Sequence, residues 1–312
     1  MDFLTIFLTI TGLIVFETVN SIDNAVINAE MLTTMGKRAR RFFLTWGIFF
    51  AVFVVRGILP WLIVFLTIPS LGFLGSFTAT FSNDPAVTEA IRSSAPILLI
   101  GGGVFLMFLF LHWLFLDKKY FGLSIEKFFF AQGVWFYAIV SILLATVVWY
   151  AIKIDPLLAF GAVVGSTAFF ITHGFRERAE VKERTLVHKG ASDVSKVLFL
   201  EVIDLSFSID GVLGAFAFTL SIPLILLGNG IGAIVVRQLT ISNIERVKRY
   251  VYLKNGAMYS VFFLGAVMIT EAFGGHVPDW LTPVITFIVI GYFFWKSKRY
   301  AASGAPLSQA SA

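Results

Sequence analysis

The sequence predicts an all-α protein, a polytopic bundle of about nine transmembrane helices. Hydrophobic residues make up 58% of the 312 residues and charged residues only 14%, which is too little charge for the surface of a soluble domain. Apolar runs long enough to cross about 30 Å of hydrocarbon recur along the whole chain. Basic residues are concentrated in alternate connections between these runs, which is typical of a multi-span membrane protein.

The apolar windows define the expected spans. They lie at roughly 3–33, 41–68, 96–116, 128–152, 156–172, 195–220, 222–241, 256–272 and 280–296. The first run is too long for a signal peptide and lacks its basic start and small-residue cleavage site, so we expect no cleaved signal. Short helices are expected in the polar connection 69–95 and in the mixed-charge connection 173–196.

The spans belong to a single transmembrane domain, residues 1–300. We expect an inverted internal repeat, with one half at about 3–116 and the other at about 195–296, joined by spans 128–172 and the connection 173–196. The segment 301–312 is expected to be a disordered cytoplasmic tail.

The Lys and Arg residues predict the orientation of the chain. They gather in the connections 35–41, 117–127, 173–196, 242–255 and 296–299. The opposite connections hold only Arg92 and Lys153. By the positive-inside rule, the N-terminus is expected outside the cell and the C-terminus in the cytoplasm.

Two stretches of the chain repeat one polar motif. Glu17-x-x-x-Ser21-Ile22-Asp23-Asn24 matches Asp204-x-x-x-Ser208-Ile209-Asp210-Gly211, and a Val-Val-Arg sequence follows each, at 54–56 and at 235–237. The expected spans place the two motifs antiparallel in the membrane. Inverted repeats with polar motifs near mid-membrane are typical of secondary transporters, whose substrate site lies between the repeats.

Five carboxylates are expected inside the hydrocarbon layer: Glu17, Asp23, Glu201, Asp204 and Asp210. An ionised Asp at the centre of a membrane helix costs about 2.5–3.5 kcal/mol. Pairing with Arg56 and Arg237 would compensate only part of this charge. We therefore expect the carboxylates to face a cavity, to form ion pairs or to bind a cation.

Helical geometry separates the acids of the first motif. At about 100° per residue, Glu17, Asn20, Ser21, Asn24 and Asn28 form one stripe, whereas Asp23 lies about 120° around the helix from Glu17. Either the helix opens near Asn20–Ser21, or the two acids have different roles. In the second motif Glu201, Asp204, Ser208 and Gly211 form the matching stripe, and Asp210 is offset.

Carboxylate, carboxamide and hydroxyl oxygens favour hard divalent cations such as Mn²⁺, Ca²⁺ or Mg²⁺. The chain has no cysteine, which excludes thiolate metal sites. A site could draw on Asp23 and Asp210, on Glu17 or Asp204, and on Asn24, and oxygen chemistry alone does not choose among the three ions.

The paired motifs, over residues 10–60 and 198–275, resemble the TerC family of integral membrane proteins, which are named for tellurium resistance. This resemblance implies manganese export across a bacterial inner (plasma) membrane. It also implies a metal site at Glu17, Asp23, Asp204 and Asp210, with Asn24 beside them. The family commonly has a hydroxyl residue after the second Asp, where this chain has Gly211.

Other polar residues have supporting roles in this interpretation. Asn20, Ser21, Ser208 and Glu201 would line the site, and Arg56 and Arg237 would act as counter-ions. We expect His112 to be a neutral, hydrogen-bonded residue and His173 to be solvated. Glu271, His276 and Asp279 could form a metal entry or exit site, although ordinary surface polarity also explains them. The glycine patches are expected at close helix contacts.

The sequence thus predicts a secondary transporter of a divalent cation, and the resemblance to the TerC family implies that this cation is manganese and that it is exported. It predicts no enzymatic activity, no cofactor other than the transported cation, and no nucleic-acid partner. The lipid bilayer is the other expected partner, and a homo-oligomer is compatible with the sequence. Two alternatives stay open: a non-transporting scaffold of a metal or tellurite stress-response complex, and an intramembrane aspartyl protease, although the Gly-x-Gly-Asp motif of such proteases is absent.

Overall fold

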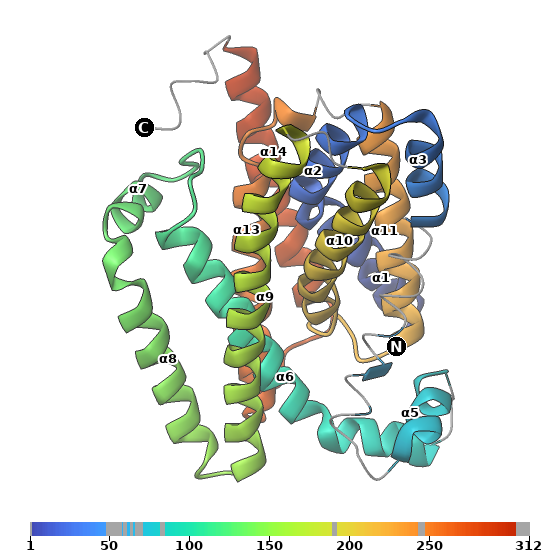
Figure 1. Ribbon diagram of the computed structural model, residues 1–312. Helices are drawn as coiled ribbons and strands as arrows, with labels where there is room; N and C mark the ends of the chain where they lie inside the picture. Colours follow the sequence, from blue (N-terminus) through green and yellow to red (C-terminus); the bar gives the residue numbers. More distant parts are fainter. Residues whose placement is uncertain are drawn as a thin grey trace.

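The computed structural model describes residues 2–47, 58, 61–62, 65, 71–81, 85–188, 192–242 and 247–303. Helices dominate this part of the chain and no strand occurs in it, which confirms the predicted all-α class. The elements are α1 (Phe3–Asn20), α2 (Ile22–Thr33), α3 (Lys37–Phe42), a π-helical turn (Phe43–Gly47), α5 (Gly72–Phe81), α6 (Pro85–Phe115), α7 (Ser124–Ala131), a 3-10 turn (Gly133–Trp135), α8 (Phe136–Ala151), α9 (Pro156–His188), α10 (Asp193–Ala215), α11 (Ile222–Ser242), α13 (Leu253–Ala272) and α14 (Leu281–Ala302) (Figure 1).

Within the described residues, six helical segments are long and apolar enough to cross a membrane. They are Phe3–Asn20, Ser94–Phe115, Gly133–Ala151, Pro156–Arg178, Ile222–Leu239 and Leu253–Ala272. The predicted spans 195–220 and 280–296 correspond to α10 and α14, and the acids and Lys196 of α10 make it more polar than an ordinary span. The predicted span 41–68 lies largely outside the described residues.

The basic connections gather at one end of the bundle. Figure 1 shows α3, α7 and the C-terminal ends of α9 and α14 at its upper end, and α5 and the start of α1 at its lower end. This grouping is what the alternation of basic connections predicts. We call the upper end of Figure 1 the basic end.

The connecting segments also follow the predictions where they are described. α5 is the short helix expected within 69–95. α9 continues without interruption to His188, so the mixed-charge connection is helical up to that residue. α14 ends at Ala302, and residues 304–312 of the predicted tail lie outside the described part of the chain.

Glycines bring α6 into close contact with α9 and α13, as the small-residue patches predict. A Cβ at Gly165 would overlap the backbone carbonyl oxygen of Gly101, and a Cβ at Gly103 would lie 3.0 Å from the carbonyl oxygen of Gly265. Tight backbone contact of this kind replaces hydrophobic burial as a source of helix association in membranes.

Gly165→Ala is expected to destabilise the fold by about 1–3 kcal/mol, because the added methyl group overlaps a backbone atom that cannot rotate away. Thermal unfolding in detergent measures this effect. Gly174→Ala on the same helix is the matched control, since a Cβ there would meet no other atom within 4 Å. Equal stability of the two variants would contradict the close contact of α6 with α9.

Candidate functional site

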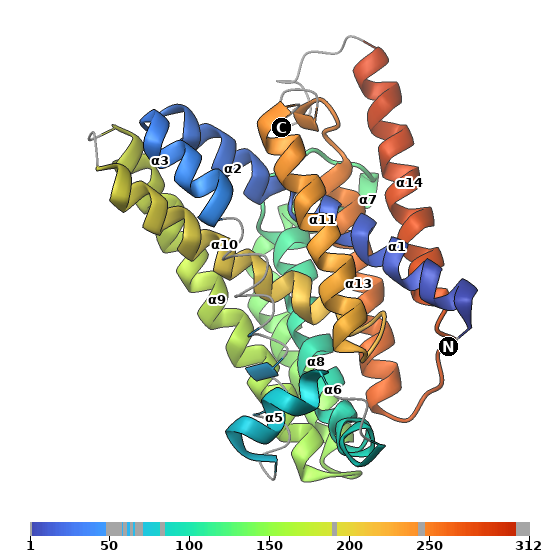
Figure 2. The same ribbon diagram turned by 90° about the vertical axis from the view of Figure 1, so that its right-hand side faces the viewer.

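The first polar motif lies where one long helix is broken in two. α1 ends at Asn20, Ser21 has φ −88° and ψ 6°, and α2 begins at Ile22 (Figure 2). The Ser21 hydroxyl donates a hydrogen bond of 2.6 Å to Oε1 of Glu17. Serine and asparagine form helices poorly and bond to local acceptors instead, which explains a break at this point. The opening that the sequence left as one alternative is therefore present.

The two acids of this motif nevertheless lie in different surroundings. Glu17 is 0% exposed. The side chain of Asp23 is 40% exposed, and its Oδ2 lies 2.9 Å from the ammonium nitrogen of Lys254. The break does not aim both carboxylates at one point, so the second alternative, different roles for the two acids, also fits the structure.

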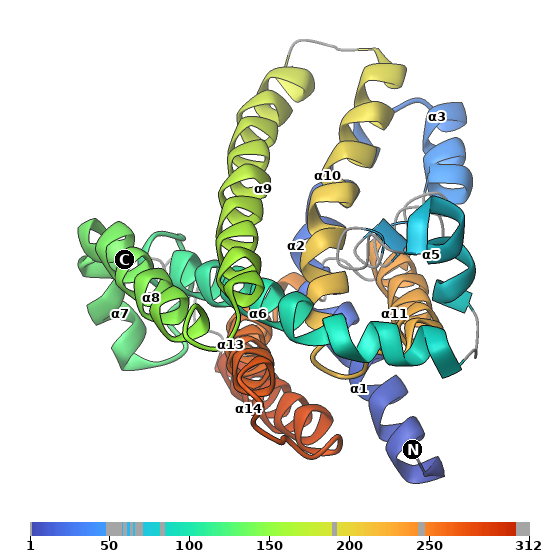
Figure 3. The same ribbon diagram turned by 90° about the horizontal axis from the view of Figure 1, so that it is seen from below.

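The second motif lies on α10, which runs antiparallel to α1 and α2. Seen from below, α10 lies between α9 and α3 (Figure 3). Low residue numbers in one segment meet high numbers in the other: Glu17 meets Gly211, Asn24 meets Asp204, and the backbone amide of Gly36 donates to Asp193. This order agrees with the predicted inverted repeat.

The contacts between the two motifs are reciprocal. In the repeat, Glu17 corresponds to Asp204 and Asn24 corresponds to Gly211. Glu17 packs against Gly211, and Asp204 accepts a hydrogen bond of 2.5 Å from Asn24. The first acid of each motif thus meets the residue that follows the second acid of the other motif, as a two-fold relation between them requires.

The two reciprocal contacts differ in the lengths of their side chains: one pairs the shorter acid with asparagine, and the other pairs the longer acid with glycine. Asp204 is the shorter acid, and the amide groups of Asn24 and Asn28 donate to its Oδ1 at 2.5 and 3.1 Å. Glu17 is longer, and a Cβ at Gly211 would lie 2.6 Å from its Oε2. Gly211, which departs from the TerC pattern, therefore provides the space that Glu17 occupies.

Gly211→Ala is expected to cost about 1–3 kcal/mol of stability, because Glu17 cannot move away from an added methyl group. Oε1 of Glu17 accepts a hydrogen bond from the Ser21 hydroxyl, and Cβ and Cγ of Glu17 lie against Gly232. Shortening the acid with Glu17→Asp should recover part of that loss in the double variant, which a double-mutant cycle of thermal unfolding measures. Gly230→Ala is the control, since a Cβ there meets nothing within 4 Å. Additive effects would contradict the proposed fit between Glu17 and Gly211.

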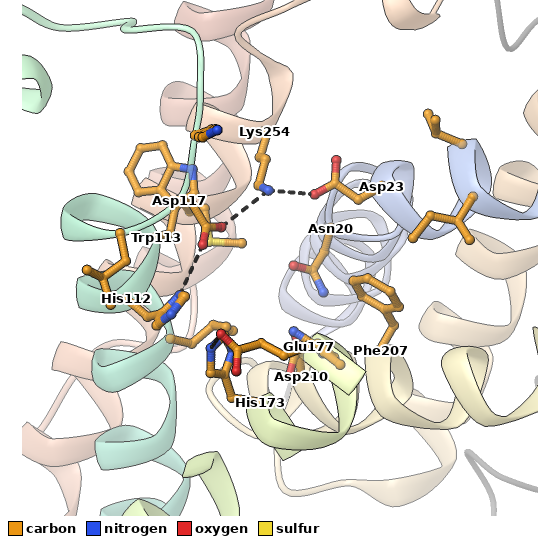
Figure 4. Close-up of a pocket in the computed structure, with 17 residues that line it drawn as sticks. Asn20, Asp23, His112, Trp113, Asp117, His173, Glu177, Phe207, Asp210 and Lys254 are labelled. Carbon is orange, nitrogen blue, oxygen red and sulfur yellow. Dashed lines mark hydrogen bonds and ion pairs between the residues drawn. The ribbon is translucent and has the colours of Figure 1, made fainter. Parts of the chain in front are cut away.

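A cavity of about 800 Å³ lies beside the motifs. Its lining includes Asn20 and Asp23 at the helix break, Asp210 of α10, and Arg176 and Lys254. It extends past Asp117, Lys118 and Glu177, which belong to the basic end of the bundle. The second acids of both motifs, Asp23 and Asp210, therefore line the same space (Figure 4).

Each of these two cavity acids forms an ion pair. Asp23 pairs with Lys254 of α13. Oδ2 of Asp210 lies 2.5 Å from Nη2 of Arg176 on α9, and these side chains are only 4% and 16% exposed. The Arg176 guanidinium also donates to the carbonyl oxygen of Ser206 and lies 4.3 Å from the centre of the Phe207 ring.

These counter-ions are not the arginines that the sequence suggested. Within the described residues Arg237 forms no ion pair with a carboxylate, and Arg56 lies outside them. Arg176 and Lys254 belong to the basic connections 173–196 and 242–255, so the sequence analysis assigned them a role in topology alone. The signal that could have revealed Arg176 is the continuation of its helix beyond residue 172, which keeps its side chain beside α10.

Two histidines also line the cavity. Nδ1 of His112 lies 3.1 Å from Oδ1 of Asp117, which confirms the expected hydrogen-bonded state of His112. The ring of His173 lies 3.8 Å from that of His112 between centroids, and it stacks on Phe169. His173 is thus held among side chains in the cavity wall, and the expectation of simple solvation is wrong.

The predicted metal ligands do not converge on one point. Glu17, Asn24 and Asp204 lie in the contacts between the motifs, whereas Asp23 and Asp210 line the cavity. Ser208 is buried, and its hydroxyl donates to the carbonyl oxygen of Asp204. Glu201 is half-buried and lies one turn before Asp204 on α10. Among the described residues no group of three or more His, Asp or Glu side chains is close enough together to hold a metal ion, and this includes Glu271, His276 and Asp279.

Beyond the cavity, a second group of charged residues fixes the connection that carries Asp117. Glu126 is fully buried and accepts hydrogen bonds from the Gly122 amide and from Asn255, at 2.7 and 2.8 Å. Burial raises the pKa of Glu126. The ammonium group of Lys119 donates to the carbonyl oxygens of Trp113 and Leu114 at the end of α6. These contacts position Asp117 against the cavity.

The structure thus defines a class: a polytopic α-helical membrane protein in which a broken helix and an antiparallel acidic helix line one cavity. The chain belongs to the family described as "Protein of unknown function (DUF475)", whose family model matches residues 22–303. No curated protein and no solved structure matches the chain.

Proposed function

We propose that the protein is a secondary transporter that exports a divalent cation, with Mn²⁺ as its preferred substrate. The observation that carries this proposal is the cavity of about 800 Å³ whose wall contains the second acid of each inverted motif, Asp23 and Asp210. Substrate sites between inverted repeats are typical of secondary transporters. The resemblance of the motifs to the TerC family supports manganese and the export direction.

The charges of the cavity fit the exchange of a divalent cation. In the empty cavity Lys254 and Arg176 balance the charges of Asp23 and Asp210. A bound divalent cation would supply the same two positive charges to Asp23 and Asp210, so these carboxylates could exchange their protein partners for the ion. Lys254 and Arg176 then need other partners, and Asp117 lies 3.4 Å from the Lys254 ammonium nitrogen. Because the predicted ligands do not converge in this arrangement, cation binding requires the motif helices to approach each other, as alternating access demands.

These ion pairs favour a cation site over an aspartyl protease, whose two catalytic carboxylates share a proton. We further propose that the basic end of the bundle faces the cytoplasm, because Lys and Arg are enriched in the cytoplasmic connections of membrane proteins. The cavity would then receive its substrate from the cytoplasm, which agrees with export.

Ion flux into liposomes tests the proposal. Wild-type protein is reconstituted, Mn²⁺ movement is followed, and Ca²⁺ and Mg²⁺ are added as competitors. We expect Mn²⁺ flux above that of protein-free liposomes, with weaker inhibition by Mg²⁺ than by unlabelled Mn²⁺. Flux no greater than in protein-free liposomes would overturn the transporter proposal in favour of the non-transporting scaffold.

A further inference from the structure

The cavity contains a row of charged and polar side chains that leads from His112 to Asp23, one acid of the proposed cation site. Figure 4 shows it running from His112 through Asp117 and Lys254 to Asp23. The His112 ring nitrogen lies 3.1 Å from Oδ1 of Asp117, Lys254 lies 3.4 Å from Oδ2 of Asp117, and Lys254 lies 2.9 Å from Asp23. Three helices and one connection contribute these four residues, so the row links the two sides of the cavity.

Lys254 has two carboxylate partners, Asp23 and Asp117, and contacts both of them in this structure. Its contact with Asp23 is shorter than its contact with Asp117. If Asp23 binds a cation, Lys254 still has Asp117 as a partner and is not left as an unpaired buried charge, which would cost several kcal/mol. Lys254 can therefore leave Asp23 at small cost only while Asp117 is free to receive it.

The availability of Asp117 depends in turn on the two histidines. The rings of His112 and His173 lie 3.8 Å apart, and two positive charges at that distance repel, so the pair is expected to take up one proton rather than two. The charged groups that face the pair are Asp117, Glu177, Arg176 and Lys254, and α8 contributes the uncharged ring of Phe136. A proton on the pair makes Asp117 the partner of an imidazolium ion, which competes with Lys254 for that carboxylate.

We propose that His112 and His173 form the binding site of a coupled proton, and that Lys254 transmits its occupancy to the cation site by shifting between Asp117 and Asp23. With the pair protonated, Asp117 is engaged by His112, Lys254 stays on Asp23, and the cation is excluded. With the pair neutral, Asp117 receives Lys254 and Asp23 is released for the cation. The inference rests on the proposed function, and it makes the protein a proton–cation antiporter.

Thermodynamic linkage gives the expected size of the pH effect on Mn²⁺ binding. Proton and cation compete, so cation binding must release the proton that the pair holds. Full competition with one proton weakens Mn²⁺ binding by up to about tenfold for each pH unit, and we expect a weakening on the order of tenfold between about pH 7.5 and about pH 5.5. Binding should release more protons at the lower pH, up to one for each ion bound.

We would titrate the full-length protein in nanodiscs with Mn²⁺ by calorimetry at both pH values. Repeating the titration in buffers of different ionisation enthalpy gives the number of protons released, besides the affinity for Mn²⁺. We expect the pH dependence to fall from about tenfold to about twofold or less in the double variant His112→Gln/His173→Gln. His276→Gln, an exposed histidine at the opposite end of the bundle, should keep the full pH dependence. Asp117→Asn leaves both histidines in place but removes the acceptor of Lys254, and it should lose the pH dependence as well.

The outcomes separate the inference from the function on which it rests. If wild-type protein binds no Mn²⁺ at either pH, the proposed function fails, and the proton site fails with it. If wild-type protein binds Mn²⁺ with no pH dependence, or if the double variant keeps the full dependence, only the histidine site is overturned. Full pH dependence in Asp117→Asn would overturn the role of Lys254.

Discussion

Asp210→Asn and Asp23→Asn are each expected to reduce Mn²⁺ flux at least about thirtyfold, because losing one charged partner of the ion removes about 2–3 kcal/mol of interaction. Asparagine keeps the shape of the side chain and removes only its charge. In either variant the cavity keeps both cations, Arg176 and Lys254, and loses one of the carboxylates that balance them, so it repels a divalent ion more strongly. Flux into reconstituted liposomes, normalised to the amount of folded protein, measures the effect.

Both variants should lose flux, because Asp23 and Asp210 line the same cavity. Asp279→Asn is the control, since this acid is exposed in the connection between α13 and α14. Wild-type flux in either of the two cavity variants would show that its carboxylate is not a ligand. A loss equal to that of Asp279→Asn would indicate a general effect of surface charge.

Arg176→Gln is expected to destabilise the protein by about 3–5 kcal/mol, because it leaves Asp210 as an uncompensated buried charge. Only 4% of the Asp210 side chain is exposed, so water cannot replace the lost partner. Adding Asp210→Asn in the same chain removes that charge and should recover most of the stability without restoring flux. Thermal unfolding in detergent of the single and double variants gives the coupling between the two residues.

The matched control for this cycle is Arg178→Gln, an exposed arginine two residues further along the same helix. Its effect on unfolding should stay within about 0.5 kcal/mol, as for most surface substitutions. If Arg176→Gln is as stable as Arg178→Gln, the ion pair with Asp210 contributes nothing to the fold. An unstable double variant would show that Arg176 acts mainly through Ser206 and Phe207.

The class of the fold followed well from the sequence, because the length and polarity of each segment are local properties. Apolar windows predicted most of the membrane helices, and the alternation of basic connections agrees with their grouping at one end of the bundle. The break at Ser21 was one of two alternatives, because poor helix formers indicate where a helix can open and not whether it does. The extension of α9 to His188 shows that this helix continues without a break from its apolar part into its charged part.

The partners of the buried acids could not be predicted in the same way. An ion pair such as Asp210 with Arg176 depends on how α9 and α10 pack against each other, and the residue pattern within one segment does not give this packing. Lys254 was assigned to topology because its position near a helix end explains it without any partner. The role of Gly211 was also invisible, since the side chain that fills its space belongs to a helix almost two hundred residues earlier.

The position of Mn²⁺ in crystals of the wild-type protein, located by the anomalous scattering of the metal, decides whether the two motifs form one cation site. We predict the strongest anomalous peak in the cavity between Asp23 and Asp210, with Lys254 moved toward Asp117. A strongest peak away from the cavity, for example beside Glu271 and Asp279, or a cavity that stays empty at saturating Mn²⁺, would contradict a cation site shared by the two motifs.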